Sequence, residues 1–577
     1  MSSNRTLRVA IVGAGPAGIY AADILSTTDL DVSIDLLERL PAPFGLVRYG
    51  VAPDHPRIKQ IIVALHKVLE RGDIRLLANV DYGVDLTLHG LRQFYDAIIF
   101  STGSIRDAPL AIPGIDLPES YGAADFVSWY DGHPDVPRTW PLEAREVAVL
   151  GAGNVALDIA RMLAKHAGDL LPTDIPANVF DQLQASPLTD VHVFARRGPA
   201  QVKFSSLELR ELGHVPDVDV VVYPEDFDFD EGSIAAIHSS NQTKQVVKTL
   251  TDWTLKEPAE MTASRRIHLH FLHRPAEVLN AEGHVAGLRT ERTRLNGDGT
   301  ASGTGEFHDW PVQAVYRAVG YFGSPLMDVP FDELKGVIPN REGRVIDVDG
   351  APMAAVYATG WIKRGPIGLI GHTKSDAAET IRHLAEDVEA DVAGLRTATD
   401  PAPEAVVDFL RAGKVPVVQW AGWELLEAHE IVLGAAADRE RIKVVPRAEM
   451  TAIARGGELP VPGLEGAASP TPCPRRSGPP ERRSDVVQPF SGPPRAYGPA
   501  EVGRQAPTVV ALTCRCRDLA RARPEGGSGF EVSVARRQAH AGAEIGCGCV
   551  DERVECHDGV GAVLAGVLPQ VAELGGA

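Results

Sequence analysis

Two stretches of the chain share one order of hydrophobic and polar positions. Each begins with a short apolar, β-branched run, at residues 7–12 and again at 146–150, followed by a glycine-rich turn. Apolar residues then recur three and four positions apart, which is the spacing of a helix with one buried face. A third stretch, at 320–395, contains a strand pattern ending in Ala-Thr-Gly. Strand, glycine turn and helix, occurring twice, predict two dinucleotide-binding units in an α/β chain.

The first turn reads Gly13-Ala14-Gly15-Pro16-Ala17-Gly18, and each glycine has its own function. Gly13 permits the tight turn, Gly15 lets a pyrophosphate approach the backbone, and Gly18 lets the helix pack on the strand. The next apolar strand, at residues 33–37, ends in Glu38. A carboxylate there accepts hydrogen bonds from a ribose diol and repels a 2′-phosphate. The turn therefore predicts FAD or NAD, against the alternative of a plain turn with an incidental surface glutamate.

The second turn, at residues 151–156, differs in two ways. Its third glycine is replaced by Ala156, a variant that the fold accepts. The strand that follows, at residues 191–195, ends in Arg196 and Arg197 instead of an acid. Guanidinium groups match a phosphate in charge and in forked geometry, so this turn favours NADP(H) over NAD(H) and the first turn becomes the FAD site. A basic, solvated strand end is the alternative.

Composition narrows the class of protein. A chain of 577 residues with 44% hydrophobic residues fits two or three globular domains. Its net charge of −20 argues against general affinity for nucleic acid or anionic membranes. No apolar run is long enough to span a membrane, and residues 1–8 lead into a strand without the pattern of a secretion signal. We expect a cytoplasmic protein.

All six cysteines lie at or after Cys473. A catalytic disulfide and a cysteine-ligated cluster are thereby excluded from the preceding residues, so their redox chemistry requires a bound cofactor. Residues 457–507 are rich in proline, glycine, serine and arginine, and hydrophobic periodicity is nearly absent until about Val560. Residues 457–577 are therefore predicted to be a low-complexity, disordered tail. Cysteine pairs in this tail, with His557 nearby, have ligand types found at metal sites, but their spacing matches no familiar one, and we predict no metal.

Several longer blocks resemble the adrenodoxin reductase type of ferredoxin–NADP+ reductase, in order along the chain. They are residues 37–56, 125–130, 153–158, 196–211 and 360–371. The resemblance implies two Rossmann-like domains of the glutathione-reductase type, with the NADPH domain inserted into the FAD domain. The implied boundaries are 1–108 and 321–456 for FAD binding, 109–320 for NADP binding, and 457–577 for the tail.

The resemblance also implies individual contacts. FAD would contact Ala17, Glu38, Leu46, Trp361, Gly368, Leu369 and Ile370, besides the turn glycines Gly13, Gly15 and Gly18. Tyr82 stands where the family usually has valine, and its contact would be through the backbone. NADP would contact Asn154, Val155, Arg196, Arg197, Glu208 and Gly368, beside Gly153 and Ala156 of the second turn. His372-Thr373-Lys374 departs from the usual Thr-Asn-Lys, beyond the flavin contacts.

Hydride transfer requires nicotinamide and flavin in close contact with water excluded. The resemblance places His55 and Glu211 beside that contact as the catalytic residues, because histidine changes charge near neutral pH and a nearby carboxylate raises its pKa. A turn histidine with a structural hydrogen bond is the alternative. Asp158, one turn into the NADP helix, is either near the partner's path or simply solvated.

The expected reaction passes electrons from NADPH through FAD to a ferredoxin-type iron–sulfur protein. Ferredoxins are usually acidic, so the partner needs a local basic patch, for which Lys203, Arg265 and Arg266 are candidates. Related enzymes that reduce quinones or form flavin peroxides remain open, as does a nucleotide-binding sensor without turnover. A monomer is expected.

Overall fold

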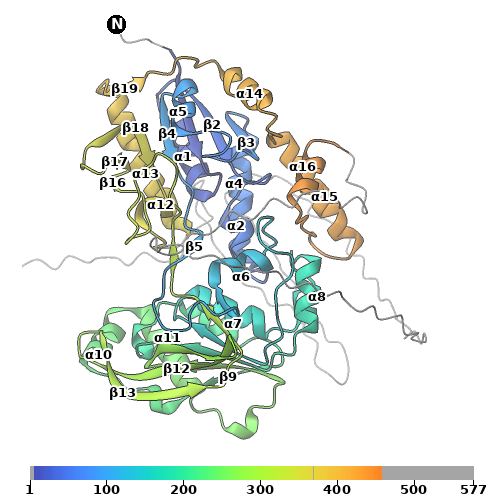
Figure 1. The fold of residues 1–577 in the computed structure, drawn as a ribbon, viewed down its shortest axis with the longest axis vertical. Coiled ribbons are helices and arrows are strands. Elements are labelled where there is room, and N and C mark those ends of the chain that lie inside the picture. Colours follow the sequence, from blue (N-terminus) through green and yellow to red (C-terminus); the bar gives the residue numbers. More distant parts are fainter. Residues whose placement is uncertain (1–4, 368–369, 458–577) are drawn as a thin grey trace, which may run out of the picture. The chain divides into compact units, whose positions relative to one another are not determined.

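The computed structural model describes residues 5–367 and 370–457. The chain divides into two units, Met1–Pro470 and Thr471–Ala577, and every described residue belongs to the first. Within it lie a seven-stranded sheet, a six-stranded sheet, and ribbons of three and two strands (Figure 1). The predicted tail lies outside the described residues except for Gly457.

The seven-stranded sheet contains the first glycine turn. Its strand order is β16-β17-β18-β4-β1-β2-β3, and β18, β4, β1, β2 and β3 run parallel. The bounds are β1 (Leu7–Val12), β2 (Val32–Glu38), β3 (Ile74–Ala78), β4 (Ala97–Phe100), β16 (Asn340–Arg341), β17 (Arg344–Ile346) and β18 (Pro352–Ala358). The sheet thus combines strands from both ends of the described chain, as the insertion of one domain into another requires.

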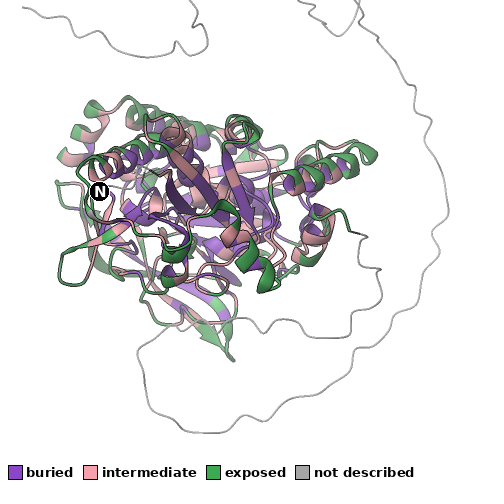
Figure 2. Cartoon of the chain, turned by 90° about the horizontal axis from the view of Figure 1, so that it is seen from above, coloured by how far each residue is buried: buried purple, intermediate pink, exposed green. Residues whose placement is uncertain are grey.

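Strand β1 is buried on both faces, as expected of a central parallel strand. Leu7, Val9 and Ile11 pack against α1 (Pro16–Ser26), α4 (Ile61–Glu70) and α13 (Ile370–Glu389). Ala10 and Val12 face α5 (Leu88–Phe94) and α14 (Pro403–Ala412). The strands at the centre of Figure 2 are mostly purple, while the helices around them expose green faces.

The six-stranded sheet is parallel throughout, with order β6-β14-β7-β8-β10-β9. Its strands are β6 (Ser120–Gly122), β7 (Glu146–Leu150), β8 (Asp190–Phe194), β9 (Val218–Val222), β10 (Arg265–His270) and β14 (Ala314–Arg317). The helices packed with it are α6 (Ala123–Tyr130), α7 (Asn154–Ala164), α8 (Ala177–Ala185), α9 (Ser206–Leu212), α10 (Glu231–Ser239) and α11 (Asn241–Trp253). All of its strands lie between residues 120 and 317, in one continuous stretch of chain.

The opposite face of this second sheet packs against an antiparallel ribbon of three strands, β11 (His273–Ala281), β12 (His284–Leu295) and β13 (Ala301–Trp310). Ala148, Leu150 and Phe194 of the sheet share a core with Val278 and Leu288 of this ribbon. We call β11–β12–β13 the three-stranded ribbon.

The chain enters and leaves the second sheet through one narrow connection. Strand β5 (Arg106–Asp107) pairs antiparallel with β15 (Tyr321–Phe322), and the amide of Ala108 donates to the carbonyl of Gly320 at 2.8 Å. The Asp107 carboxylate also accepts from the amide of Ala124 at 2.9 Å, near the start of α6. The two crossings are therefore neighbours in space although more than 200 residues separate them.

The remaining described elements are short helices and the C-terminal region. They are α2 (Leu46–Tyr49), α3 (Pro56–Lys59), α12 (Trp361–Arg364), β19 (Ala393–Arg396), α15 (Trp420–Ala436) and α16 (Arg447–Ala454). None of the helices in residues 5–367 and 370–457 is long and apolar enough to cross a membrane.

Candidate functional site

The first glycine turn joins β1 to α1 through contacts that leave no room for a side chain. A Cβ on Gly18 would lie 2.0 Å from the carbonyl oxygen of Gly13. A Cβ on Gly13 would lie 2.7 Å from the carbonyl oxygen of Ser101, and Gly13 has a φ of 111°. The Ser101 hydroxyl donates to the carbonyls of Val12 and Gly13 at 3.0 and 2.8 Å. Strand and helix thus approach as closely as the nucleotide-binding turn requires.

Glu38, at the end of β2, faces this turn. Its carboxylate accepts from the amide of Ala14 at 2.9 Å and from that of Leu40 at 3.0 Å. Burial raises the pKa of Glu38, and the two amide bonds oppose that rise. The first turn of α1 begins at Gly15 and has no side-chain cap, so its amides remain able to bind a phosphate. The acid and the open helix start have the chemistry of an adenosine diphosphate site.

Two further glycines surround the first turn. A Cβ on Gly45 would lie 3.0 Å from the Cα of Gly15, and Gly45 has a φ of 48°. A Cβ on Gly360 would lie 2.5 Å from the Cβ of Ala17. Leu46 and Trp361, both expected to contact FAD, directly follow these glycines as the first residues of α2 and α12. The fold therefore brings both of them to the start of α1.

The other expected FAD contacts differ in how far the structure describes them. The Tyr82 hydroxyl donates to the carbonyl of Met327 at 2.7 Å, and its ring meets Phe100 edge-on at 5.1 Å between centroids. This side chain is engaged elsewhere, so a cofactor contact would use the Tyr82 backbone. Gly368 and Leu369 lie outside the described residues, and Ile370 is described only as the first residue of α13.

The second glycine turn joins β7 to α7. Gly151 has a φ of 145°, and a Cβ there would lie 2.2 Å from the carbonyl oxygen of Ala318, whereas a Cβ on Gly153 would meet nothing within 4 Å. Ala156, in place of the third glycine, is fully buried. The side chain of Asn154 accepts from the amide of Ser205 at 2.8 Å, and the neighbouring Val155 is half-buried. Gly151 is thus packed as tightly as Gly13, whereas Gly153 has no neighbour comparable to Gly45, which lies against Gly15 at the first turn.

Arg196 and Arg197 follow β8, beside the second turn. Arg196 is exposed and Arg197 is half-buried. The Arg197 guanidinium donates to the carbonyls of Gly299 at 3.2 Å and Gln201 at 3.1 Å. Burial and the charge of Arg196 lower the pKa of Arg197. Two adjacent guanidinium groups at the carboxyl edge of a parallel sheet suit a phosphate.

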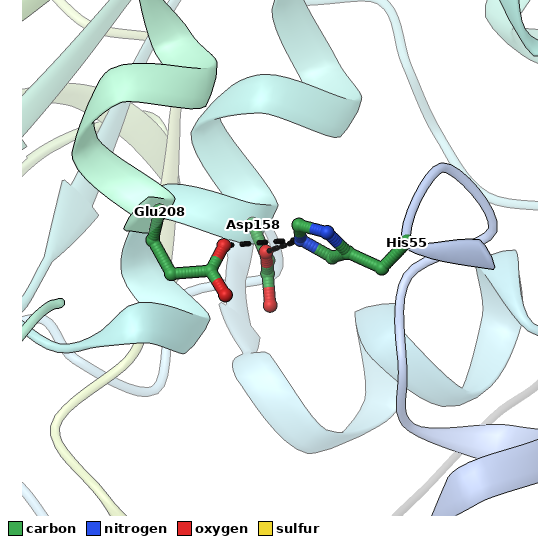
Figure 3. Close-up of side chains that lie close together, drawn as sticks. All are labelled: His55, Asp158 and Glu208. Atoms are coloured by element: carbon green, nitrogen blue, oxygen red, sulfur yellow. Dashed lines mark hydrogen bonds and ion pairs between the residues drawn. The ribbon is translucent and has the colours of Figure 1, made fainter. Parts of the chain in front are cut away.

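His55, at the start of α3, meets carboxylates of α7 and α9 (Figure 3). Its Nε2 lies 2.9 Å from Asp158 Oδ1 and 3.1 Å from Glu208 Oε2, and its Nδ1 lies 3.1 Å from Glu211 Oε2. Ser205 caps α9 by accepting from the amide of Glu208 at 3.2 Å, the first half of a Ser-x-x-Glu capping box. The structure thus brings together the two predicted catalytic residues, His55 and Glu211, with Asp158 beside them.

Arginine and aspartate complete this cluster. Arg161, 2% exposed, donates to Asp54 at 2.8 Å and to Asp158 at 2.7 Å, and it also contacts His55 Nε2. Lys165 donates to the same Asp54 at 2.8 Å. These cations hold the pKa of Asp54 far below its usual range against the opposing effect of burial. The sequence prediction missed Asp54, Arg161 and Lys165, although Arg161 follows Asp158 by three positions on the same helix face.

The carboxylates decide the charge of His55. Burial lowers the pKa of His55 and Arg161 lowers it further, but hydrogen bonds to Asp158 and Glu208 raise it to about 10. Burial raises the pKa of Glu211, and the charge of His55 opposes that rise. The cluster can therefore hold a proton on His55 at neutral pH, with Glu211 as a half-exposed neighbour.

His55, Asp158 and Glu208 also have the ligand types of a metal site, with ligand atoms within 4.8 Å of one another. The Arg161 guanidinium reaches the same histidine nitrogen and the same aspartate oxygen. A metal ion there would meet this buried positive charge, so the geometry favours an ion-pair cluster over a cation site.

The expectation of an exposed basic patch is wrong for Arg265, whereas Arg266 stays a prediction. Arg265 is 9% exposed, and its guanidinium donates to the carbonyls of Ala164 and Lys165 at 3.2 and 3.0 Å. Both arginines begin β10, at the amino end of a parallel strand, whereas the glycine turn and Arg196 follow carboxyl ends. Lys203 is exposed, and its amide donates to the carbonyl of Ala152 at 2.8 Å, so this candidate does lie beside the second turn.

Comparison with known proteins agrees with this geometry. A profile of the pyridine nucleotide-disulphide oxidoreductase family matches residues 7–198. NADPH-ferredoxin reductase FprA of Mycobacterium tuberculosis is 39% identical over 466 residues, 78% of this chain and 100% of that protein. The mitochondrial NADPH:adrenodoxin oxidoreductase of Arabidopsis thaliana is 35% identical over 468 residues, 78% of this chain and 96% of that protein. A solved structure of the Mycobacterium tuberculosis FprA in complex with NADPH has 38% identity and a TM-score of 0.72, covering 78% of this chain and 100% of that one.

Proposed function

The chain belongs to the family of NADPH-ferredoxin reductases and NADPH:adrenodoxin oxidoreductases, and from this we propose that it transfers electrons from NADPH through FAD to a ferredoxin-type iron–sulfur protein. The observation that carries the proposal is the meeting of His55 with Asp158, Glu208 and Glu211. These residues come from segments that also contain the first and second glycine turns, so a single cluster links two nucleotide sites.

FAD is assigned to the first turn. The close approach of Gly15 and Gly45 provides a cradle that side chains would fill, and the Glu38 carboxylate suits a ribose diol. NADPH, as the substrate, is assigned to the second turn, where Arg196 and Arg197 match a 2′-phosphate. FAD, when bound, supplies the chemistry that accepts a hydride and releases electrons singly, and the protein supplies geometry and electrostatics.

The cluster around His55 would serve the nicotinamide end of NADPH. Its carboxylates keep the imidazole protonated, and Arg161 with Lys165 fixes Asp54, the residue before His55. A protonated histidine held between α7 and α9 orients neighbouring groups and donates from both Nε2 and Nδ1. Glu211, 35% exposed, offers the Nδ1 proton a route toward solvent. This assignment of catalytic roles to His55 and Glu211 is part of the proposal.

The division of the chain is also proposed here. Residues 1–108 with 321–456 would bind FAD, and 109–320 would bind NADP, supported by the strands that each sheet draws on. We further propose a cytoplasmic monomer that binds an acidic ferredoxin through a basic patch including Lys203. Rates with ferredoxin should then fall steeply as ionic strength rises.

The test is cytochrome c reduction by purified protein with and without an added ferredoxin, using NADPH and then NADH. The proposal expects a large ferredoxin-dependent gain and a clear preference for NADPH. Strong quinone or dye reduction with no ferredoxin gain would support a different reductase activity. A yellow protein without turnover would instead favour a nucleotide sensor, and either result contradicts the proposed function.

A further inference from the structure

The backbone of the Arg196-Arg197 pair is bound by the three-stranded ribbon and by Leu272, the residue before it. The Thr293 hydroxyl donates to the carbonyl of Arg196 at 2.8 Å, and the amide of Leu272 donates to the carbonyl of Arg197 at 3.2 Å. Thr293 is 4% exposed, so its hydroxyl has few alternatives to this bond. The ribbon therefore fixes where the two arginines leave the sheet.

The ribbon also reaches the Arg197 side chain. The turn between β12 and β13, residues 296–300, presents the carbonyl of Gly299 to the Arg197 guanidinium at 3.2 Å. We call these residues the ribbon turn. The second carbonyl on that guanidinium is that of Gln201, and the Gln201 side chain donates to the Ser233 hydroxyl at 2.9 Å. Arg197 is thus held from both sides.

The ribbon turn itself rests on the start of α10, which Figure 1 draws beside β13. The amide of Gly297 donates to the Asp230 carboxylate at 2.6 Å, and the same carboxylate accepts from the amide of Ser233 at 2.7 Å. A Cβ on Gly232 would lie 2.7 Å from the carbonyl oxygen of Gly297 and 2.9 Å from the amide nitrogen of Gly299. Only glycine at position 232 lets the turn lie this close.

These contacts form a closed hydrogen-bonded circuit. It runs from Arg197 to the ribbon turn, then to Asp230, Ser233 and Gln201, and returns to Arg197. A free arginine side chain loses rotamer entropy when a ligand fixes it. Here the circuit fixes Arg197 before any ligand arrives, so binding incurs less of that cost. The guanidinium has five N–H donors, and two carbonyls do not exhaust them.

We propose that the ribbon turn is a specificity element, which orders Arg197 for the 2′-phosphate and so determines the preference for NADPH over NADH. The inference rests on the proposed function, in which the second turn binds NADPH. It assigns the role of Gly232, Thr293 and the turn as positioning residues that act through Arg196 and Arg197 without contacting the ligand themselves.

The decisive variant is Gly232→Ala, whose new methyl group would push the ribbon turn away from α10. Binding is measured on the FAD-loaded protein by calorimetry with 2′,5′-ADP, which carries the 2′-phosphate, and with 5′-AMP, which lacks it. We expect affinity for 2′,5′-ADP to fall about tenfold, the loss of roughly one pre-ordered side chain, with 5′-AMP affinity unchanged. The control is Gly168→Ala in the same region, where a Cβ meets nothing within 4 Å, and neither ligand should respond.

Thr293→Val is the second variant, because it keeps the side-chain shape and removes only the bond to Arg196. It should weaken 2′,5′-ADP binding several-fold and spare 5′-AMP. Equal weakening of both ligands, or no weakening of either, in folded protein overturns the inference and leaves only a structural role. Failure of the proposed function has a different signature: the unaltered protein would then bind 2′,5′-ADP no better than 5′-AMP.

Discussion

The two glycine turns follow the same pattern in sequence and differ in how tightly they are enclosed. Around the first, Gly13, Gly18, Gly45 and Gly360 all stand where a side chain would collide with neighbouring atoms. At the second, Gly151 collides in the same way with the carbonyl of Ala318, but Gly153 has open space around it and Arg196 is exposed. An enclosed site with a half-buried acid suits a cofactor that stays bound, and a less enclosed site with an exposed cation suits a substrate that exchanges. One motif therefore gives two kinds of binding, according to what surrounds it.

The largest expected effect is the loss of FAD from Gly18→Ala. A Cβ 2.0 Å from the carbonyl oxygen of Gly13 forces α1 away from β1. We expect purified protein without bound flavin, measured by its absorbance. The comparison variant is Gly153→Ala, at a position of the second turn where a Cβ meets nothing within 4 Å, and it should keep FAD and raise KM for NADPH. Equal flavin content in the two variants would show that the turns do not differ as described.

Next in size is Arg196→Ala, which should raise KM for NADPH about 30-fold and leave KM for NADH unchanged. A hydrogen bond between charged groups contributes about 1.5–3 kcal/mol, and only NADPH offers the 2′-phosphate. Arg266→Ala, at the opposite edge of the same sheet, is the control and should leave both constants unchanged. A parallel rise in KM for NADH would mean that Arg196 acts on the fold.

His55→Gln should slow hydride transfer about tenfold while FAD content stays unchanged, since an amide cannot hold the proton that the carboxylates stabilise. Stopped-flow flavin bleaching measures the rate.

The His55 pKa of about 10 also has a consequence for stability. A folded-state pKa above the ordinary 6.5 gives stability that is present below pH 6.5 and lost as pH rises toward 10. Melting curves should therefore show less alkaline destabilisation in His55→Gln, while His89→Gln, at an exposed site, behaves as the unaltered protein.

The smallest expected effect is on the stability of the protein at acid pH, and it involves three stacked histidines. His192, His268 and His270 stack on one face of the second sheet, with His192 and His268 rings 4.4 Å apart. Burial, with the charge of neighbouring His268 adding to it, lowers the pKa of His192 to about 4. Unfolded histidine binds a proton below 6.5 and the folded residue does not, so stability falls as pH drops from 6.5 toward 4. His192→Phe should reduce that slope by about 1 kcal/mol per pH unit, seen in urea titrations. His89→Phe, at an exposed site, should change nothing.

Local pattern was enough to predict both glycine turns, because strand, turn and helix are neighbours in sequence. It also gave Glu38 and Arg196, since each ends the strand that follows its turn. The Asp54–Arg161 pair escaped prediction because it joins residues more than 100 positions apart, and only tertiary packing brings them together. Arg265 was misplaced for a related reason: a charge at a strand start lies at the sheet edge away from the nucleotide.

Neither the stacking of the histidines nor the contacts of the ribbon turn could be predicted from the sequence. The stack depends on the parallel register that sets His268 opposite His192, and no sequence period reveals a register. The ribbon turn meets Arg197 only because Gly232, on another element, lets two backbones approach. Such contacts depend on how the helices and strands are arranged in space, whereas each glycine turn is formed by one continuous stretch of chain.

The pairing of β5 with β15 affects how a chain of this kind can change during evolution. The two chain segments that lead into and out of the second sheet are hydrogen-bonded to each other, with the amide of Ala108 donating to the carbonyl of Gly320 at 2.8 Å. A segment whose ends touch can be removed, exchanged or relocated in a gene while the remaining strands keep their order, because a short splice rejoins them. The stretch between these residues can therefore vary as one unit during evolution, provided that its contacts with Asp54 and His55 are kept.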